Sequence, residues 1–127
     1  HDVLPKHTSW ATLSWTSGAV ASTPDDLAGI VRGIRDATLV SAAGKANMLP
    51  AVPVKGSNGE TAVGMGLFRF EFSGRKFIAH EGLFIGSQAF AGWDEDDGTI
   101  IIVIGNRSTF KMDEIVSRLS AAIRKAD

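Results

Sequence analysis

The sequence predicts an α+β fold: N-terminal helices, then an antiparallel β-meander of about four strands, then a C-terminal helix packed on the sheet. Three changes in hydrophobic period support this prediction. Apolar residues recur at helical spacing before residue 50, alternate or form a short run between residues 65 and 104, and return to helical spacing after residue 111. The length of 127 residues suits one domain, residues 1–127, and no internal repeat is visible.

Two helices are expected after an irregular entry over residues 1–21. The first begins at Ser22–Asp26, where a hydroxyl cap precedes a proline and acids of the first turn, and runs to about Asp36. Its apolar stripe has helical spacing: Leu27, Ile30, Val31 and Ile34. A second, shorter helix should extend from Ser41, as its cap, to Leu49. Residues 50–62 are expected to form a loop, because glycine and proline interrupt them.

Four strands are expected next. Met65–Phe72 alternates, with its phenylalanines on one face, and a tight Ser73–Gly74 turn returns the chain as a short strand over Lys76–His80. A third strand should cover Gln88–Trp93, followed by an acidic, solvated turn at Asp94–Gly98. The last strand, Thr99–Ile104, is apolar on both faces and is expected at the centre of the sheet. The closing helix should contain these apolar positions: Met112, Ile115, Val116, Leu119, Ala122 and Ile123.

Composition excludes several classes of function. With 13 basic and 14 acidic residues and no basic cluster, the chain lacks the positive surface of a nucleic-acid-binding protein. The absence of cysteine excludes disulfides and thiolate sites, and the longest apolar run, at Thr99–Gly105, is too short for a transmembrane segment. No targeting segment is visible and the first residue is not methionine, so we expect the chain to have been cropped, processed or engineered from something longer.

His80 is the residue with the clearest chemical potential. It closes an apolar strand and is followed by Glu81 and Gly82, an arrangement in which the imidazole can face a cleft and a ligand can approach the glycine backbone. From this local pattern alone, a partly buried strand histidine before an ordinary glycine turn remains the favoured interpretation. The histidines have no metal-ligand spacing, and no Gly-x-Ser-x-Gly elbow singles out a nucleophile. Neither a metal nor another cofactor is expected.

Four segments in order give a resemblance to a known family. The matching segments of class C β-lactamases are a serine-rich helix start, similar to residues 17–28, and a Gly-Leu-Gly strand start, similar to residues 64–67. They continue with a His-x-Gly box, similar to residues 77–82, and an Asn-Arg-Ser strand end, similar to residues 102–108. Related penicillin-binding proteins, D-Ala-D-Ala carboxypeptidases and esterases share these segments. The resemblance covers most of residues 17–123, and it implies a partial β-lactamase/transpeptidase-like fold.

The resemblance also implies a mechanism in which a serine attacks an amide, ester or β-lactam carbonyl and forms an acyl-enzyme. In that family the nucleophile and the tyrosine motif precede the matched region, and this chain contains no tyrosine at all. The nucleophile and base are therefore expected on a missing N-terminal part, and the chain alone is expected to be inactive. Family members are often periplasmic or secreted, although the residues themselves leave the compartment open.

By the same resemblance, the chain supplies the third wall of the active site. His80 would face the substrate, and Gly82 would leave the strand edge open for substrate pairing, with Glu81 beside it. The N–H of Leu83 would occupy the second oxyanion-hole position. Three positions depart from the family's usual residues. Glu81 stands where a small residue is usual, Leu83 where glycine is common, and Ser87 where an aromatic residue is often found. We therefore expect the cleft to differ in shape.

A non-catalytic interaction module is the alternative hypothesis. A half-fold of this kind lacks the N-terminal strands of the parent sheet, which would leave a strand edge exposed. That edge could bind an N-terminal companion chain or a second copy of the chain as a homo-oligomer. The two hypotheses differ in their ligands: the hydrolase takes a small-molecule or peptide substrate, whereas the module binds a protein strand.

Overall fold

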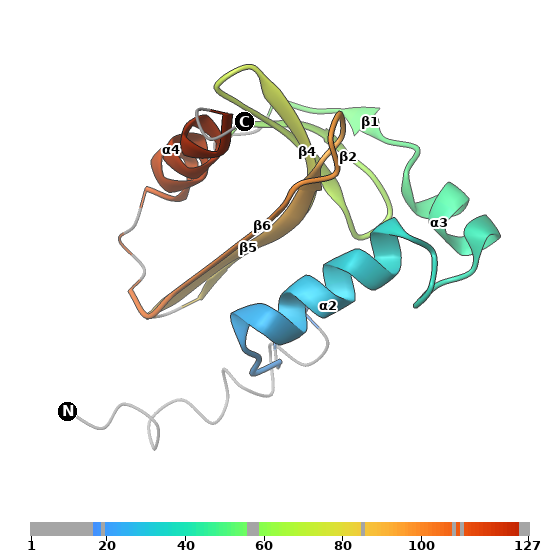
Figure 1. The fold of residues 1–127 in the computed structure, drawn as a ribbon, viewed down its shortest axis with the longest axis horizontal. Coiled ribbons are helices and arrows are strands. Elements are labelled where there is room, and N and C mark those ends of the chain that lie inside the picture. Colours follow the sequence, from blue (N-terminus) through green and yellow to red (C-terminus); the bar gives the residue numbers. More distant parts are fainter. Residues whose placement is uncertain are drawn as a thin grey trace.

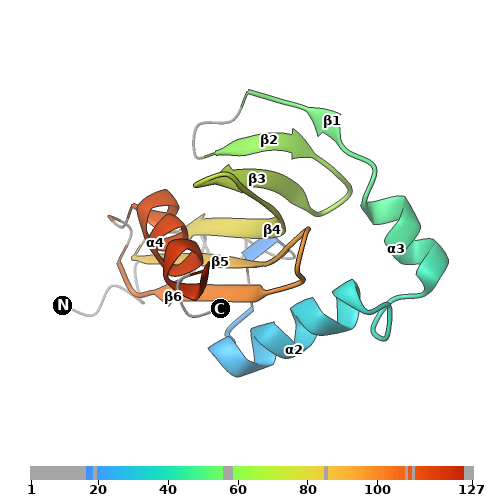
Figure 2. The same cartoon turned by 45° about the horizontal axis from the view of Figure 1, so that its top comes forward.

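The structure is a computed structural model that describes residues 17–18, 20–55, 59–84, 86–107, 109 and 111–124. Its elements, in order, are α2 (Pro24–Arg35), α3 (Ala42–Met48), β1 (Val52–Pro53), β2 (Glu60–Val63), β3 (Phe68–Phe72), β4 (Arg75–Phe84), β5 (Ser87–Asp94), β6 (Ile100–Gly105) and α4 (Met112–Arg124). The described strands form one antiparallel sheet in the order β1 to β6 (Figure 2). Helices α2 and α4 lie on opposite sides of this sheet (Figure 1).

The α+β class is confirmed, but the expected number of strands is wrong, because the described sheet has six rather than about four. The two additional strands are β1 and β2, and all their residues except Val63 lie in the segment 50–62 that the sequence indicated as a loop. They are only two and four residues long. Segments this short carry too few residues to show an alternating pattern. The pairing of β2 with β3, and of β1 with β2, decides their structure.

Both N-terminal helices begin where their capping residues predicted. Thr23 caps α2 by accepting a hydrogen bond on Oγ1 from the N–H of Asp26, at 3.2 Å. Ser41 caps α3 in the same way, with its Oγ 3.0 Å from the N–H of Gly44. These contacts satisfy N–H groups that have no partner within a helix. The expected entry over residues 1–21 falls largely outside the described residues.

The sheet has an apolar core on each face. One core lies beneath α4, and Phe70, Phe77, Phe90 and Val116 are fully buried there. The other lies beneath α2, around Val31, Leu67, Ile78 and Trp93. The predicted phenylalanine face of β3 is confirmed, since Phe68, Phe70 and Phe72 all pack on the α4 side.

The last strand, β6, is not central as expected but lies at the edge of the described sheet. Its apolar run does have two buried faces. Ile101 and Val103 pack toward α4, whereas Ile100 and Ile102 pack toward α2. A strand that is covered by a helix on each face is apolar on both faces, whether it lies at the centre or at the edge of a sheet. The apolar pattern therefore shows that both faces of β6 are covered but not where the strand lies in the sheet.

The acidic turn after β5 is also less solvated than expected. Asp94 is 1% exposed and accepts a hydrogen bond from Arg75, which is itself 3% exposed, with 2.5 Å between Nε and Oδ2. The other oxygen of Asp94 accepts hydrogen bonds from the main-chain N–H groups of Asp96 and Asp97. The acid at the start of the turn is therefore a buried structural group, while Asp96 and Asp97 remain exposed.

Candidate functional site

The candidate site is built on the part of β4 that extends past β3. The pairing of β3 with β4 begins at Phe72↔Arg75 and ends at Phe68↔Ala79. Strand β4 nevertheless continues for five more residues and pairs with β5 as far as Phe84↔Ser87. The sequence placed the end of this strand at His80, which is wrong. All four predicted site residues, His80 to Leu83, therefore lie within a strand and not in a glycine turn.

The two hairpins fix the direction of the main chain in this projecting segment. The two-residue turn between β3 and β4 has a positive φ at both residues, 52° at Ser73 and 72° at Gly74. Phe72 and Arg75 on either side of it form a hydrogen-bonded pair, as in other two-residue hairpins. Because hydrogen-bonding directions alternate along an antiparallel strand, Glu81 and Leu83 turn their N–H and C=O toward the side that β3 has left. The intervening residues, His80 and Gly82, turn theirs toward β5.

Side chains in the segment alternate between the two faces of the sheet. Glu81 and Leu83 share the α4 face with their neighbours on β5, Phe90 and Gln88. His80 belongs to the opposite face. It is exposed, and its ring lies edge-on to Phe68 at the end of β3, with 5.2 Å between centroids and 76° between planes. The structure thus keeps the four predicted residues adjacent, and the imidazole contacts Phe68, which itself packs toward α4.

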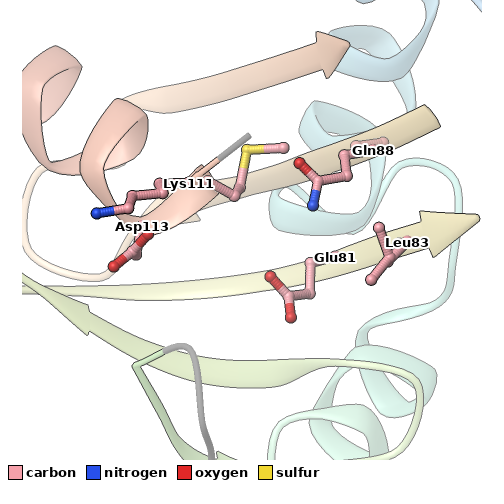
Figure 3. Close-up of a pocket in the computed structure, with 8 residues that line it drawn as sticks. Glu81, Leu83, Gln88, Lys111 and Asp113 are labelled. Carbon is pink, nitrogen blue, oxygen red and sulfur yellow. The ribbon is translucent and has the colours of Figure 1, made fainter. Parts of the chain in front are cut away.

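A pocket of about 190 Å³ lies on the α4 face. Residues of β4, β5 and the start of α4 line it: Glu81, Gly82, Leu83, Gln88, Ala89, Lys111, Met112 and Asp113. Figure 3 shows Glu81, Leu83 and Gln88 on the two strands, with Lys111 and Asp113 at the beginning of the helix. Three of the four predicted site residues therefore meet at one cavity.

The polar groups of the pocket are mostly acceptors. The Oε1 atom of Gln88 is buried and has no hydrogen-bond partner in the described part of the chain. Lys111 donates from Nζ to the carboxylate of Glu114 at 2.8 Å, and this hydrogen bond raises the pKa of Lys111 above its ordinary value. The lysine is therefore protonated and already paired, which leaves Asp113 and Glu81 as the other charged groups of the lining.

Sequence reasoning missed Gln88, Lys111 and Asp113 as site residues. Gln88 is the only glutamine of the chain and pairs with Leu83 across the hairpin, but that neighbourhood requires the register of β4 and β5. Lys111 and Asp113 are separated from Gln88 by more than twenty residues of sequence. No spacing rule connects them, because the fold of α4 over the sheet brings them together.

Two serines stand three residues before a lysine, a spacing that sequence reasoning passed over. Ser73 lies in the β3–β4 turn and Lys76 in β4. Ser73 is a turn residue with a φ of 52°, and the described residues show no hydrogen bond between its hydroxyl and Lys76, so this pair lacks the contact through which a lysine activates a serine. The second serine, Ser108, lies outside the described residues, and its lysine is Lys111.

The described residues also bear on metal binding and on membrane-spanning helices. They contain no cluster of three or more His, Asp or Glu side chains that could hold a metal ion. None of the helices described is long and apolar enough to cross a membrane.

Comparison with known proteins gives a fold but no family. No protein-family model matches the sequence, and no curated protein matches it. Solved structures of D-amino acid amidase from Ochrobactrum anthropi SV3 do match. The complex with L-phenylalanine amide gives a TM-score of 0.76 at 23% identity over 83% of this chain. A second structure of the same amidase gives a TM-score of 0.72 at 22% identity over 80% of this chain.

The chain has the fold of part of this amidase. It corresponds to 32% of the amidase chain in the L-phenylalanine amide complex and to 34% in the second structure. The chain therefore spans about a third of the length of the structures that it matches. The likeness supports the expected α+β architecture and shows that the fold of this chain is related to that of D-amino acid amidase.

Proposed function

We propose that this chain forms the C-terminal wall of a serine hydrolase that cleaves amide, ester or β-lactam bonds through an acyl-enzyme. The nucleophile and its base lie on another part of the protein, so the 127 residues alone are inactive. Within this wall, the N–H of Leu83 donates to the carbonyl oxygen as negative charge develops on it. His80 provides a hydrogen-bonding side chain at the opening of the site.

The projecting segment of β4 is the observation that carries this proposal. An extended substrate can pair with a strand only where main-chain groups face away from existing neighbours, and Leu83 is at such a position. Gly82 adds no side chain to this segment, and a Cβ there would meet no atom within 4 Å. The likeness to part of an amidase, an enzyme named for amide hydrolysis, agrees with this chemistry.

Two variants of Leu83 separate its main-chain role from its side chain. Leu83→Pro removes the N–H that faces away from β5, so the β4–β5 ladder is retained. In a protein that joins this chain to its nucleophile-bearing part, we expect kcat to fall about 10²- to 10³-fold. Leu83→Ala keeps the N–H and should change kcat little. Equal kcat values for folded proline and alanine variants would contradict the role of the N–H.

A second candidate function is strand-mediated assembly through β6. This strand lies at the edge of the described sheet, and its pairing with β5 turns the N–H and C=O of Ile100, Ile102 and Ile104 outward. An edge of this length can pair with a companion chain or with a second copy. On this hypothesis the chain is a non-catalytic interaction module.

The mass of the chain in solution tests this second candidate. Ile104 is 43% exposed, and Ile104→Pro removes an outward N–H without affecting the β5 ladder. Strand pairing predicts a dimer by light scattering that becomes a monomer in the proline variant, whereas Ile104→Val leaves it dimeric. A monomer in all three proteins at micromolar concentration would exclude self-assembly through β6.

A further inference from the structure

We propose that the pocket between β4, β5 and the start of α4 binds an ammonium group. The inference rests on the proposed function and deepens it, since it specifies a substrate that carries a positively charged amine on the side facing α4. The pocket adjoins the projecting segment of β4 directly, because Glu81 and Leu83 contribute their main chains to the edge and their side chains to the lining.

The geometry of a paired substrate connects the edge to the pocket. A substrate that extends along β4 has substituents that alternate between the two faces of the sheet, as the residues of a strand do. Those on one face lie near His80, and those on the other lie beside Glu81 and Leu83, at the mouth of the pocket. The pocket therefore meets a substituent of the substrate and not the bond that is cleaved.

The buried amide oxygen of Gln88 indicates that this substituent is a donor. Leaving a buried acceptor without a partner carries a free-energy cost, and such atoms are rare in folded proteins. The cost is removed when a bound group donates a hydrogen bond to it. An ammonium group has three N–H donors and no acceptor, which fits an isolated carbonyl oxygen.

The charges of the lining favour a cation over an anion. Asp113 and Glu81 are acids, and the single basic residue, Lys111, is already paired with Glu114. The N-terminus of α4 attracts anions, but its first turn carries two acids of its own, Asp113 and Glu114, which offset that attraction. The lining thus holds two acids and one base, a formal charge of −1, together with one amide oxygen that lacks a partner in the described part of the chain.

The test uses the chain as it stands and n-butylammonium chloride as the probe, with 1-butanol and sodium butyrate as its neutral and anionic counterparts. Because Gln88 is the only glutamine, its side-chain NH₂ signals can be identified by residue type in an NMR titration. We expect n-butylammonium to shift these signals in a saturable way. Butanol and butyrate should bind at least about tenfold more weakly.

Three variants then locate the binding energy. Gln88→Met keeps the size of the side chain but removes the acceptor, and it should weaken n-butylammonium binding about tenfold, as followed by the N–H signals of Leu83 and Ala89. Asp113→Asn, at an exposed position, should weaken it two- to threefold, roughly the effect of one exposed charge pair. Lys111→Met should leave binding unchanged or tighten it. The backbone spectrum of each variant verifies its fold.

Two results would overturn the inference: a butyrate affinity equal to or higher than that of n-butylammonium, or unchanged binding in Gln88→Met. Either result concerns the pocket alone. Hydrolysis by the longer protein, and its dependence on the N–H of Leu83, would still support the proposed function. Conversely, selective ammonium binding by a chain whose longer protein forms no acyl-enzyme would support the pocket and contradict the hydrolase.

Discussion

At the scale of single residues, Arg75 and Asp94 form an ion pair in which both side chains are almost completely buried. Arg75 also donates to the exposed Asp97, and one of its terminal nitrogens lies 3.5 Å from the carbonyl oxygen of Ser120 on α4. The guanidinium therefore connects the start of β4, the turn after β5 and the closing helix. The sequence showed only an acidic turn, because burial of Asp94 depends on how α4 covers this end of the sheet.

Arg75→Met should destabilise the fold by about 3–5 kcal/mol, because it leaves the carboxylate of Asp94 buried without its cation. Chemical unfolding in urea at pH 7 measures this change. Arg69→Met is the matched control, since Arg69 and Glu95 form a partly exposed pair. It should cost less than about 1 kcal/mol. Equal losses in the two variants would show that burial does not distinguish the pairs.

Asp97 provides a prediction on pH. Thr99 donates to its carboxylate from its side chain and from its main-chain N–H, at 2.8 Å for the latter, and Arg75 lies beside it. These contacts hold the pKa of Asp97 below its ordinary value. A lowered folded-state pKa means that the stabilisation is complete above the unfolded value of about 4 and is lost as the pH falls through the folded value.

Asp97→Asn should therefore reduce stability at pH 6 but have little effect near pH 2. Thermal unfolding of both proteins between pH 2 and pH 7 measures the difference in Tm, which should shrink below about pH 4. Asp96→Asn, a change of the same size and charge in the same turn, is the control. A difference in Tm that stays constant down to pH 2 would contradict the lowered pKa.

At the scale of elements, the close approach of β4 and β5 depends on Gly92. A Cβ built on this glycine would lie 2.3 Å from the Cβ of Ala79 and 2.6 Å from the carbonyl oxygen of Ile78. Gly82, ten residues earlier, has no atom within 4 Å of the same position. Packing of the two strands therefore requires a glycine at position 92, whereas the projecting segment has space for a side chain at position 82.

Gly92→Ala should destabilise the fold by at least about 1–3 kcal/mol, because the added methyl group would have to push the two strands apart. Gly82→Ala should change the free energy of unfolding by less than about 1 kcal/mol. Urea unfolding of the two variants at pH 7 makes the comparison. A large loss in Gly82→Ala would mean that this part of β4 is packed against something and is not open to a substrate.

The sequence predicted elements well where local chemistry determines them. The helix starts at Thr23 and Ser41 and the turn at Ser73 follow from capping and turn preferences, so they could be placed from the chain alone. By contrast, β1, β2 and the position of β6 depend on contacts between distant residues. The same limit applies to the site: His80 to Leu83 form one run of sequence, whereas Gln88 and Lys111 join them only through the register of β5 and the packing of α4.

At the scale of the whole molecule, the chain matches about a third of a D-amino acid amidase in length and shares its fold over that part. Its two open strand segments, the end of β4 and the outer side of β6, are the places where the described sheet can accept further chain or ligand. In the proposed function, the first receives substrate and the remainder of the protein supplies the nucleophile.

The most direct test is covalent labelling with a fluorescent alkyl phosphonate, which reacts with activated serines, followed by mass spectrometry to locate the label. The proposal predicts that the 127-residue chain is not labelled. A protein that joins it to its nucleophile-bearing part should be labelled on a serine outside these residues, and Leu83→Pro should slow that labelling. A label on a serine within this chain, or hydrolysis of an amide or ester by the chain alone, would contradict the proposal that the nucleophile lies outside these residues.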